Sequence, residues 1–205
     1  FSEDNKSEIK KLSRQFLNVT FLISVPCCCG IILVADQIVE VLFGVEFLPA
    51  ISTIRILSIL IVLMPLSGGV FCQLLLTAGK EKSYLACVLI GTVVNAVLNY
   101  LLIPTLTQNG AAIASVIAEF TVSISMIVAT RRTIKVNMCC RDVFSILTSA
   151  FFMSLTLVLC HKLFSGQAVW MRLLVEIVIA VLVYFLCVFM LKNSASSKII
   201  RMIKK

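Results

Sequence analysis

The fold of this chain is determined by residues 74–119, LLLTAGKEKSYLACVLIGTVVNAVLNYLLIPTLTQNGAAIASVIAE. Apart from Glu119, the charges of this stretch lie in a turn at 77–83. Two apolar segments of helix length follow, separated by a short uncharged turn after Pro104. Asn95, Asn99 and Glu119 interrupt these apolar segments. A polar side chain deep in a bilayer is costly unless it packs against a partner or lines a water-filled path. The stretch therefore favours a membrane transporter over an inert anchor.

The composition places the whole chain in the membrane. Hydrophobic residues make up 60% of the sequence, charged residues only 14%, and the mean hydropathy is +1.08. A soluble domain carries roughly 25% charged residues. The chain also begins at Phe1 with a charged run, without an initiator methionine or the apolar core of a signal peptide. We therefore expect an integral membrane protein, present here as a C-terminal fragment.

Six apolar segments are long enough to cross a hydrocarbon core about 30 Å thick, which takes roughly 20 helical residues. A further apolar stretch, 37–48, is too short to span and is expected to lie in the interface or to tuck back against the bundle. Strands are excluded because no alternating pattern of the kind found in membrane barrels is present. The predicted fold is an all-α transmembrane bundle of six spanning helices, at 15–35, 55–77, 84–104, 110–130, 143–161 and 170–191.

The basic residues predict the orientation of these helices. With the first residues in the cytoplasm, 15 of the 18 Lys and Arg residues fall on the cytoplasmic side, and only Arg55, Lys162 and Arg172 lie outside. Both termini are then cytoplasmic, and the basic patches contact membrane lipids rather than nucleic acid. The predicted organisation is a cytoplasmic lead-in (1–14), a four-helix part (15–130), a basic cytoplasmic loop (131–142), two additional helices (143–191) and a basic cytoplasmic tail (192–205).

Enzyme chemistry finds no support in the sequence. The nine cysteines show no C-x-x-C spacing and fall mostly inside spans, where a free thiol packs as a small apolar group. The single histidine, His161, lies beside Lys162 at the outer end of a span and is expected to be solvated. A nucleophile–histidine–acid set, a phosphate-binding loop and paired catalytic carboxylates are all missing from the sequence. We therefore expect neither catalytic residues nor a bound metal or cofactor.

Glu119 is the leading candidate for a functional residue. It lies about 14 Å along the span that enters near Gly110, which is close to the midplane. Asn95 lies roughly 16 Å along the preceding antiparallel span, at a similar level, and shares a helix face with Asn99. We expect Asn95 to face Glu119 or a central cavity. Glu119 would then couple transport to protons, latch two helices together, or pack as a structural carboxyl.

Proline and glycine interrupt two of the spans. Pro26 lies in the middle of the first, and Pro65, Gly68 and Gly69 interrupt the second. In a membrane such interruptions persist because neighbouring groups satisfy the freed backbone atoms. These residues are hinge candidates for alternating access, with static kinks as the alternative.

Three further polar positions lie toward the ends of spans. Arg55 at the outer end of the second span would attract an anionic substrate or anchor to headgroups, and Gln73 near its inner end would line a cytoplasmic vestibule or pack. Arg172 and Glu176 are four residues apart on the last span and are expected to neutralise each other.

Four passages of the sequence resemble the C-terminal half of the O-antigen flippases, the bacterial polysaccharide transporters of the multidrug/oligosaccharidyl-lipid/polysaccharide exporter superfamily. The resemblance covers roughly residues 10–130, and the last two spans match only in position and hydrophobicity. It rests on Ser24-Val25-Pro26 with Gly30 and Ala35-Asp36, on 41–44 leading to 47–50, on 76–80, and on 95–119 with Leu102-Ile103-Pro104.

This resemblance implies a partial second lobe of a two-lobed fold plus two extra C-terminal helices. It also implies that the protein flips undecaprenyl-pyrophosphate-linked oligosaccharide, an O-antigen or capsule repeat unit, across the bacterial inner membrane by alternating access. Polysaccharide polymerase machinery would be a further partner. One alternative is a cation-coupled exporter of the multidrug-extrusion type, which shares the fold. The other is a non-transporting membrane scaffold, in which Glu119 is bonded to a partner and no cavity lies beside Asn95 and Asn99.

Overall fold

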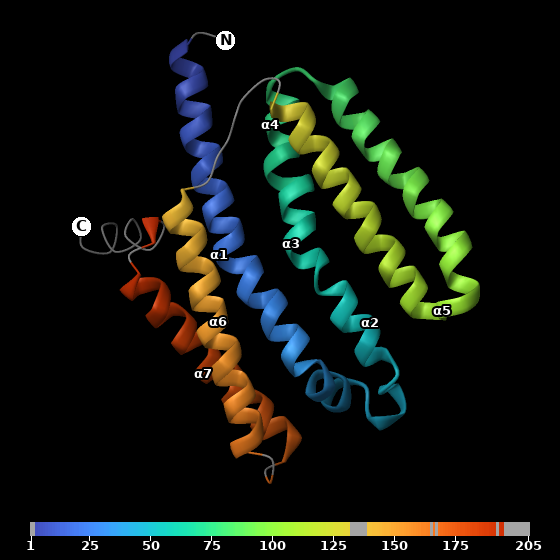
Figure 1. Ribbon diagram of the computed structural model, residues 1–205, viewed down its shortest axis with the longest axis vertical. Coiled ribbons are helices and arrows are strands. Elements are labelled where there is room, and N and C mark those ends of the chain that lie inside the picture. Colours follow the sequence, from blue (N-terminus) through green and yellow to red (C-terminus); the bar gives the residue numbers. More distant parts are fainter. Residues whose placement is uncertain (1–2, 132–138, 165, 167, 192, 195–205) are drawn as a thin grey trace. The chain divides into compact units, whose positions relative to one another are not determined.

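The computed structural model describes residues 3–131, 139–164, 166, 168–191 and 193–194, and every regular element in this part of the chain is helical (Figure 1). Five of these helices are long and apolar enough to cross a membrane, so the predicted all-α transmembrane fold is confirmed. The elements are α1 (Glu3–Leu42), the 3-10 helix η1 (Val45–Phe47), α2 (Ala50–Leu57), α3 (Leu60–Met64), the π-helix η2 (Pro65–Phe71), α4 (Cys72–Thr77), α5 (Glu81–Arg131), α6 (Cys140–Leu163) and α7 (Val169–Met190).

The contacts divide the chain into two compact units, each with its own packing. The first consists of Phe1–Thr20 and Ile59–Met138, and the second of Phe21–Ser58 and Cys139–Lys205. In the second unit α6 and α7 pack along each other. The predicted topological segments stay a prediction, and residues 132–138 of the basic loop and 195–205 of the tail lie outside the described residues.

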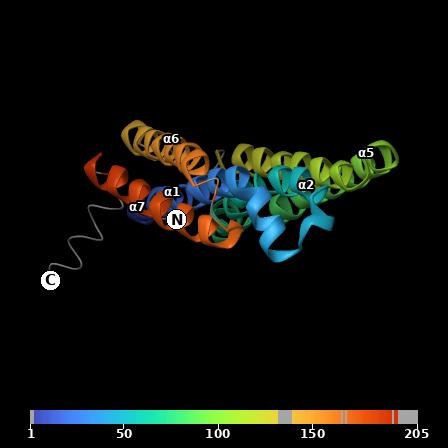
Figure 2. The same cartoon turned by 90° about the horizontal axis from the view of Figure 1, so that it is seen from below.

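The helix α5 is a hairpin of two limbs. A straight helix of its 51 residues would be about 77 Å long, far more than a bilayer requires. The backbone instead turns at Thr107, whose φ of 50° and ψ of −126° are non-helical. The limbs lie against each other, with Gly91 facing Val122 and Gly110 facing the carbonyl of Leu102 (Figures 1 and 2). The limbs are the predicted third and fourth spans.

The helix α1 is longer than the sequence predicts. It begins at Glu3 and ends at Leu42, so residues 37–42 of the short apolar stretch continue the first helix, and the predicted location of 37–48 at the interface or against the bundle stays a prediction. No glycine or proline follows Gly30 until Gly44, and the helix continues with Ala35 and Val39 fully buried on one face. Gly44 then adopts a φ of +87°, which a glycine reaches at little cost, and the helix has ended before it.

Pro26 does not break α1, because its effect on the backbone is compensated from α7. A proline has no N–H to donate to the carbonyl four residues earlier, which here belongs to Leu22. The buried hydroxyl of Tyr184 donates to that carbonyl at 2.7 Å. The freed backbone acceptor is therefore satisfied inside the second unit.

The second predicted span is the segment α2–α3–η2–α4. Its glycines and proline do interrupt the α-helix: Pro65 begins η2, which also contains Gly68 and Gly69. A π-helix shifts the backbone hydrogen bonds by one residue, and such stretches often occur at functional sites.

Candidate functional site

A groove in the first unit gathers the polar residues that the sequence places in mid-span. It has a volume of about 480 Å³ and is formed by α3, η2 and both limbs of α5. Among its lining residues are the polar or small side chains of Ser67, Gly68, Asn95, Ser115 and Glu119. Apolar spans thus enclose a groove with a polar lining.

The carboxylate of Glu119 is held by a serine from the π-helix. The Ser67 hydroxyl, which belongs to a residue only 3% exposed, donates to Glu119 Oε1. The same oxygen lies 3.2 Å from the carbonyls of Leu63 and Met64. A hydroxyl carries one proton, so it bonds to one of these acceptors at a time. Ser67 is therefore able to change partners when Glu119 changes charge.

Asn95 lines the same groove as Glu119, in agreement with the depth argument from the sequence. Asn99 Nδ2 donates to Asn95 Oδ1 at 2.9 Å, as expected for residues one turn apart. This bond fixes the amide of Asn95, whose side-chain N–H groups remain available as donors. The two asparagines and Glu119 form one polar patch, and their roles in transport stay a prediction.

Three of the four hinge candidates lie in η2, one of the elements that form this groove. Pro65, Gly68 and Gly69 all lie in η2, the element that carries Ser67. An added Cβ at Gly68 would meet nothing within 4 Å, so the backbone of η2 is not tightly enclosed there. Pro26 belongs to the second unit and takes no part in the groove.

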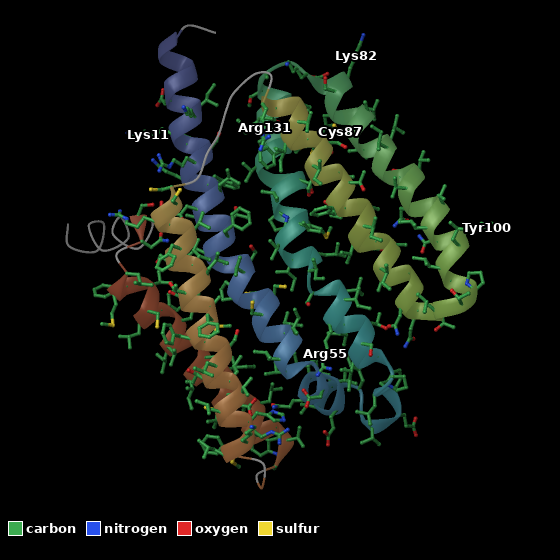
Figure 3. All side chains as sticks on the ribbon, in the orientation of Figure 1. Lys11, Arg55, Lys82, Cys87, Tyr100 and Arg131 are labelled. Carbon is green, nitrogen blue, oxygen red and sulfur yellow. The ribbon has the colours of Figure 1, made fainter. Side chains whose placement is uncertain are left out.

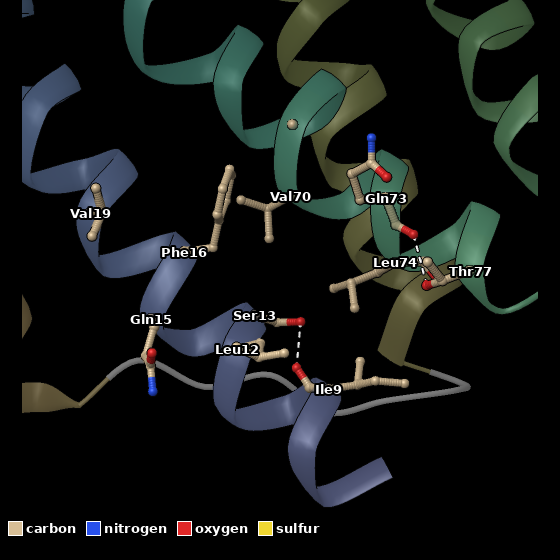
Figure 4. Close-up of a pocket in the computed structure, with 11 residues that line it drawn as sticks. Ile9, Leu12, Ser13, Gln15, Phe16, Val19, Val70, Gln73, Leu74 and Thr77 are labelled. Carbon is tan, nitrogen blue, oxygen red and sulfur yellow. Dashed lines mark hydrogen bonds between the residues drawn. The ribbon is translucent and has the colours of Figure 1, made fainter. Parts of the chain in front are cut away.

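Gln73 and Arg55 lie away from the groove. Gln73 lines a mainly apolar depression of about 490 Å³ between α1 and α4, shown in Figure 4 with Phe16 and Val70. Arg55, labelled in Figure 3, is in the second unit, where its Nε donates to the Ile32 carbonyl at 3.1 Å. The structure therefore brings Asn95, Asn99 and Glu119 together but neither Gln73 nor Arg55.

Among the polar contacts of the described residues that the sequence did not predict, two bear on the candidate sites. One is Ser67, which has no distinguishing signal in the sequence. The other is a buried cluster in the second unit, where Gln37 Nε2 donates to Glu176 Oε2 at 2.7 Å and lies 2.9 Å from His161 Nδ1. The predicted Arg172–Glu176 pair is present at 3.8 Å, whereas His161 is bonded rather than simply solvated.

The site contains no evident metal centre. In the described part of the chain, no three residues of His, Cys, Asp or Glu are close enough to hold an ion together.

Comparison with solved structures finds a protein of the same fold. A solved structure titled "Lipid II flippase MurJ, inward closed conformation" superposes with a TM-score of 0.73 at 14% identity. The alignment covers 98% of this chain and 41% of that one, so the chain spans less than half the length of that protein. At this identity the likeness shows the fold alone. No curated protein sequence matches the chain.

The family model described as "Lipid II flippase MurJ" matches residues 1–189. The match supports the superfamily of lipid-linked flippases that the resemblance predicts, without singling out its O-antigen branch. It also agrees with the expectation of a transporter rather than an enzyme and, together with the apolar helices, with a multi-pass protein of the inner membrane. The chain belongs to the MurJ family of lipid II flippases.

Proposed function

We propose that this chain is part of a flippase that moves a lipid-linked glycan precursor across the bacterial inner membrane, with the peptidoglycan precursor lipid II as its substrate. The observation that carries the proposal is the family match over residues 1–189. The distribution of basic residues supports a cytoplasmic location for both termini of this chain.

The groove of the first unit supplies a site for coupling in this proposal. Glu119 is an ionisable group about halfway along its limb of α5, and such residues commonly mark ion or proton pathways in membrane proteins. When Glu119 is ionised, Ser67 donates to it. When Glu119 is protonated, the carboxyl is itself a donor, and the Ser67 hydroxyl is released toward the carbonyls of Leu63 or Met64.

This exchange of partners takes place inside the π-helix η2. Pro65, Gly68 and Gly69 give that element a backbone that is less firmly hydrogen-bonded than an α-helix. We infer that the charge of Glu119 biases the local conformation of η2, which serves as the hinge for alternating access. Asn95 and Asn99, on the facing limb, offer amide groups to the substrate or to the coupling ion.

The substrate is tested by complementation with the complete protein that carries this chain. One host is depleted of its own lipid II flippase, and a second lacks its O-antigen flippase. We expect growth to be restored in the first host. Restored O-antigen in the second host alone would assign the O-antigen branch instead. Failure in both hosts, with normal amounts of protein in the membrane, would overturn the flippase proposal and favour the multidrug exporter or the scaffold.

The role of Glu119 is tested in the host that is rescued. Glu119→Gln keeps the size of the side chain and removes its charge, and we expect it to abolish rescue at an unchanged membrane level of the protein. Glu46→Gln is the matched control, because Glu46 is an exposed carboxylate in η1, outside the groove. If Glu119→Gln rescues as well as Glu46→Gln, Glu119 is a packing residue.

A further inference from the structure

The buried polar cluster of the second unit joins three helices and is not used by the function proposed above. Gln37 comes from α1, His161 from the end of α6 and Glu176 from α7. Gln37 is fully buried and Glu176 is 1% exposed. Buried polar groups of this kind are expensive unless each is bonded, so a set that crosses three helices needs an explanation.

With Glu176 ionised, the hydrogen bonds assign the proton of His161 to one of its two nitrogens. The Gln37 amide then directs its nitrogen toward Glu176 Oε2, because the opposite orientation would place two acceptor oxygens 2.7 Å apart. The second N–H of the same amide then points at His161 Nδ1, 2.9 Å away. Nδ1 must accept this bond. His161 is therefore neutral, with its proton on Nε2.

The second oxygen of Glu176 is left without a hydrogen bond. Among the described residues Glu176 Oε1 is buried and unbonded, although it lies 3.7 Å from His161 Nδ1 and 3.8 Å from Arg172 Nε. A protonated Nδ1 is a donor, so it can no longer accept from the N–H of Gln37. It can instead donate to Glu176 Oε1 in a charge-assisted hydrogen bond, which requires the two atoms to move closer by less than about 1 Å. One proton thus changes which helix His161 is bonded to.

We propose that His161 is a proton-binding site that exchanges its Nδ1 bond from Gln37 on α1 to Glu176 on α7 when it becomes protonated. Histidine is the side chain that ordinarily changes charge between pH 5 and 8. The neutral form ties α6 to α1, and the charged form ties α6 to α7. The packing of α1 in this unit then depends on pH.

The side chain of His161 is partly exposed, whereas the carboxylate of Glu176 is covered. The side chain of His161 is 41% exposed and that of Glu176 is 0% exposed. His161 and Glu176 both line a small cavity of about 190 Å³. The titratable and charged groups that face the pair from the surrounding elements are Asp36 on α1, Arg55 on α2, Cys160 and Lys162 on α6, and Arg172 on α7.

The experiment uses the fact that the sequence contains a single histidine. The chain is reconstituted in lipid nanodiscs with ¹⁵N-labelled histidine, and NMR reads the charge and tautomer of His161 as the pH is varied. At high pH we expect the tautomer with its proton on Nε2. A neutral form with the proton on Nδ1 would overturn the proposal, and this test needs no variant.

Two variants then test the exchange of partners, each at one end of the pH range. Gln37→Met removes the donor to Nδ1 in the neutral form, so the hydrogen-bonded ¹⁵N shift of Nδ1 at high pH is lost. Glu176→Gln removes the carboxylate partner of the charged form, so the low-pH shift of Nδ1 changes while its high-pH shift is kept. Glu46→Gln, which alters an exposed carboxylate outside the cavity, changes neither shift. An unchanged low-pH shift in Glu176→Gln would refute the exchange.

Discussion

Pro26 and Tyr184 make a pair whose interaction is measurable. The Tyr184→Phe substitution removes one oxygen from a residue that is 2% exposed and leaves the Leu22 carbonyl without its donor. Leu22 cannot recover a helical bond, because the residue four positions later is Pro26. The substitution therefore lowers the free energy of unfolding by the full cost of leaving a buried carbonyl without a hydrogen bond.

The expected loss is about 1–2 kcal/mol in the free energy of unfolding. An unsatisfied buried acceptor costs about 1–3 kcal/mol, and side-chain hydrogen bonds within membranes reach about 1.7 kcal/mol in favourable cases. In a Pro26→Ala background the residue at 26 regains its N–H, and the Leu22 carbonyl regains a backbone donor. Tyr184→Phe should then cost only about 0.5 kcal/mol or less, so the double-mutant cycle gives a coupling of about 1 kcal/mol.

Denaturant unfolding in lipid or detergent, followed by tryptophan fluorescence, measures this cycle. Trp170 is the single tryptophan of the chain and lies on α7, the helix that carries Tyr184. Tyr100→Phe is the matched control, because Tyr100 is 82% exposed and its substitution should be nearly neutral. If Tyr184→Phe costs the same with and without Pro26, its hydroxyl does not replace the missing backbone donor, and the reasoning is wrong.

The α5 hairpin leads to two further predictions. An added Cβ at Gly110 would collide with the Leu102 carbonyl oxygen, whereas Gly30 has nothing within 4 Å. Gly110→Ala should therefore destabilise the hairpin by about 1–3 kcal/mol and speed the alkylation of Cys87, which is buried in the other limb, as measured by mass spectrometry. Gly30→Ala should stabilise the chain by up to about 1 kcal/mol. Thr107→Gly should slow that alkylation, since it relieves about 1–3 kcal/mol of strain at a φ of 50°; faster alkylation would contradict the strain.

The local features of the fold were predictable because they depend on composition and on the constant rise of a helix. Apolar segments of about 20 residues predicted the spans, and the uncharged stretch after Pro104 predicted the turn now seen at Thr107. Depth along two antiparallel helices placed Asn95 near Glu119, since both distances follow from about 1.5 Å per residue. The continuation of the first helix to Leu42 was not predicted, because the length of 37–48 was considered without the helix that precedes it.

By itself, then, the sequence determined the all-α membrane class, the two apolar limbs that flank the turn near Thr107, and the similar level of Asn95 and Glu119 along those limbs. These features follow from composition and from the rise of a helix per residue. The tertiary structure decided which side chains meet. Ser67 and Glu119 are 52 residues apart, Gln37 and His161 are 124 apart, and Gln37 and Glu176 are 139 apart. Such contacts depend on how each helix is rotated about its axis. That rotation is set by the packing of whole faces, to which no single residue type is a guide.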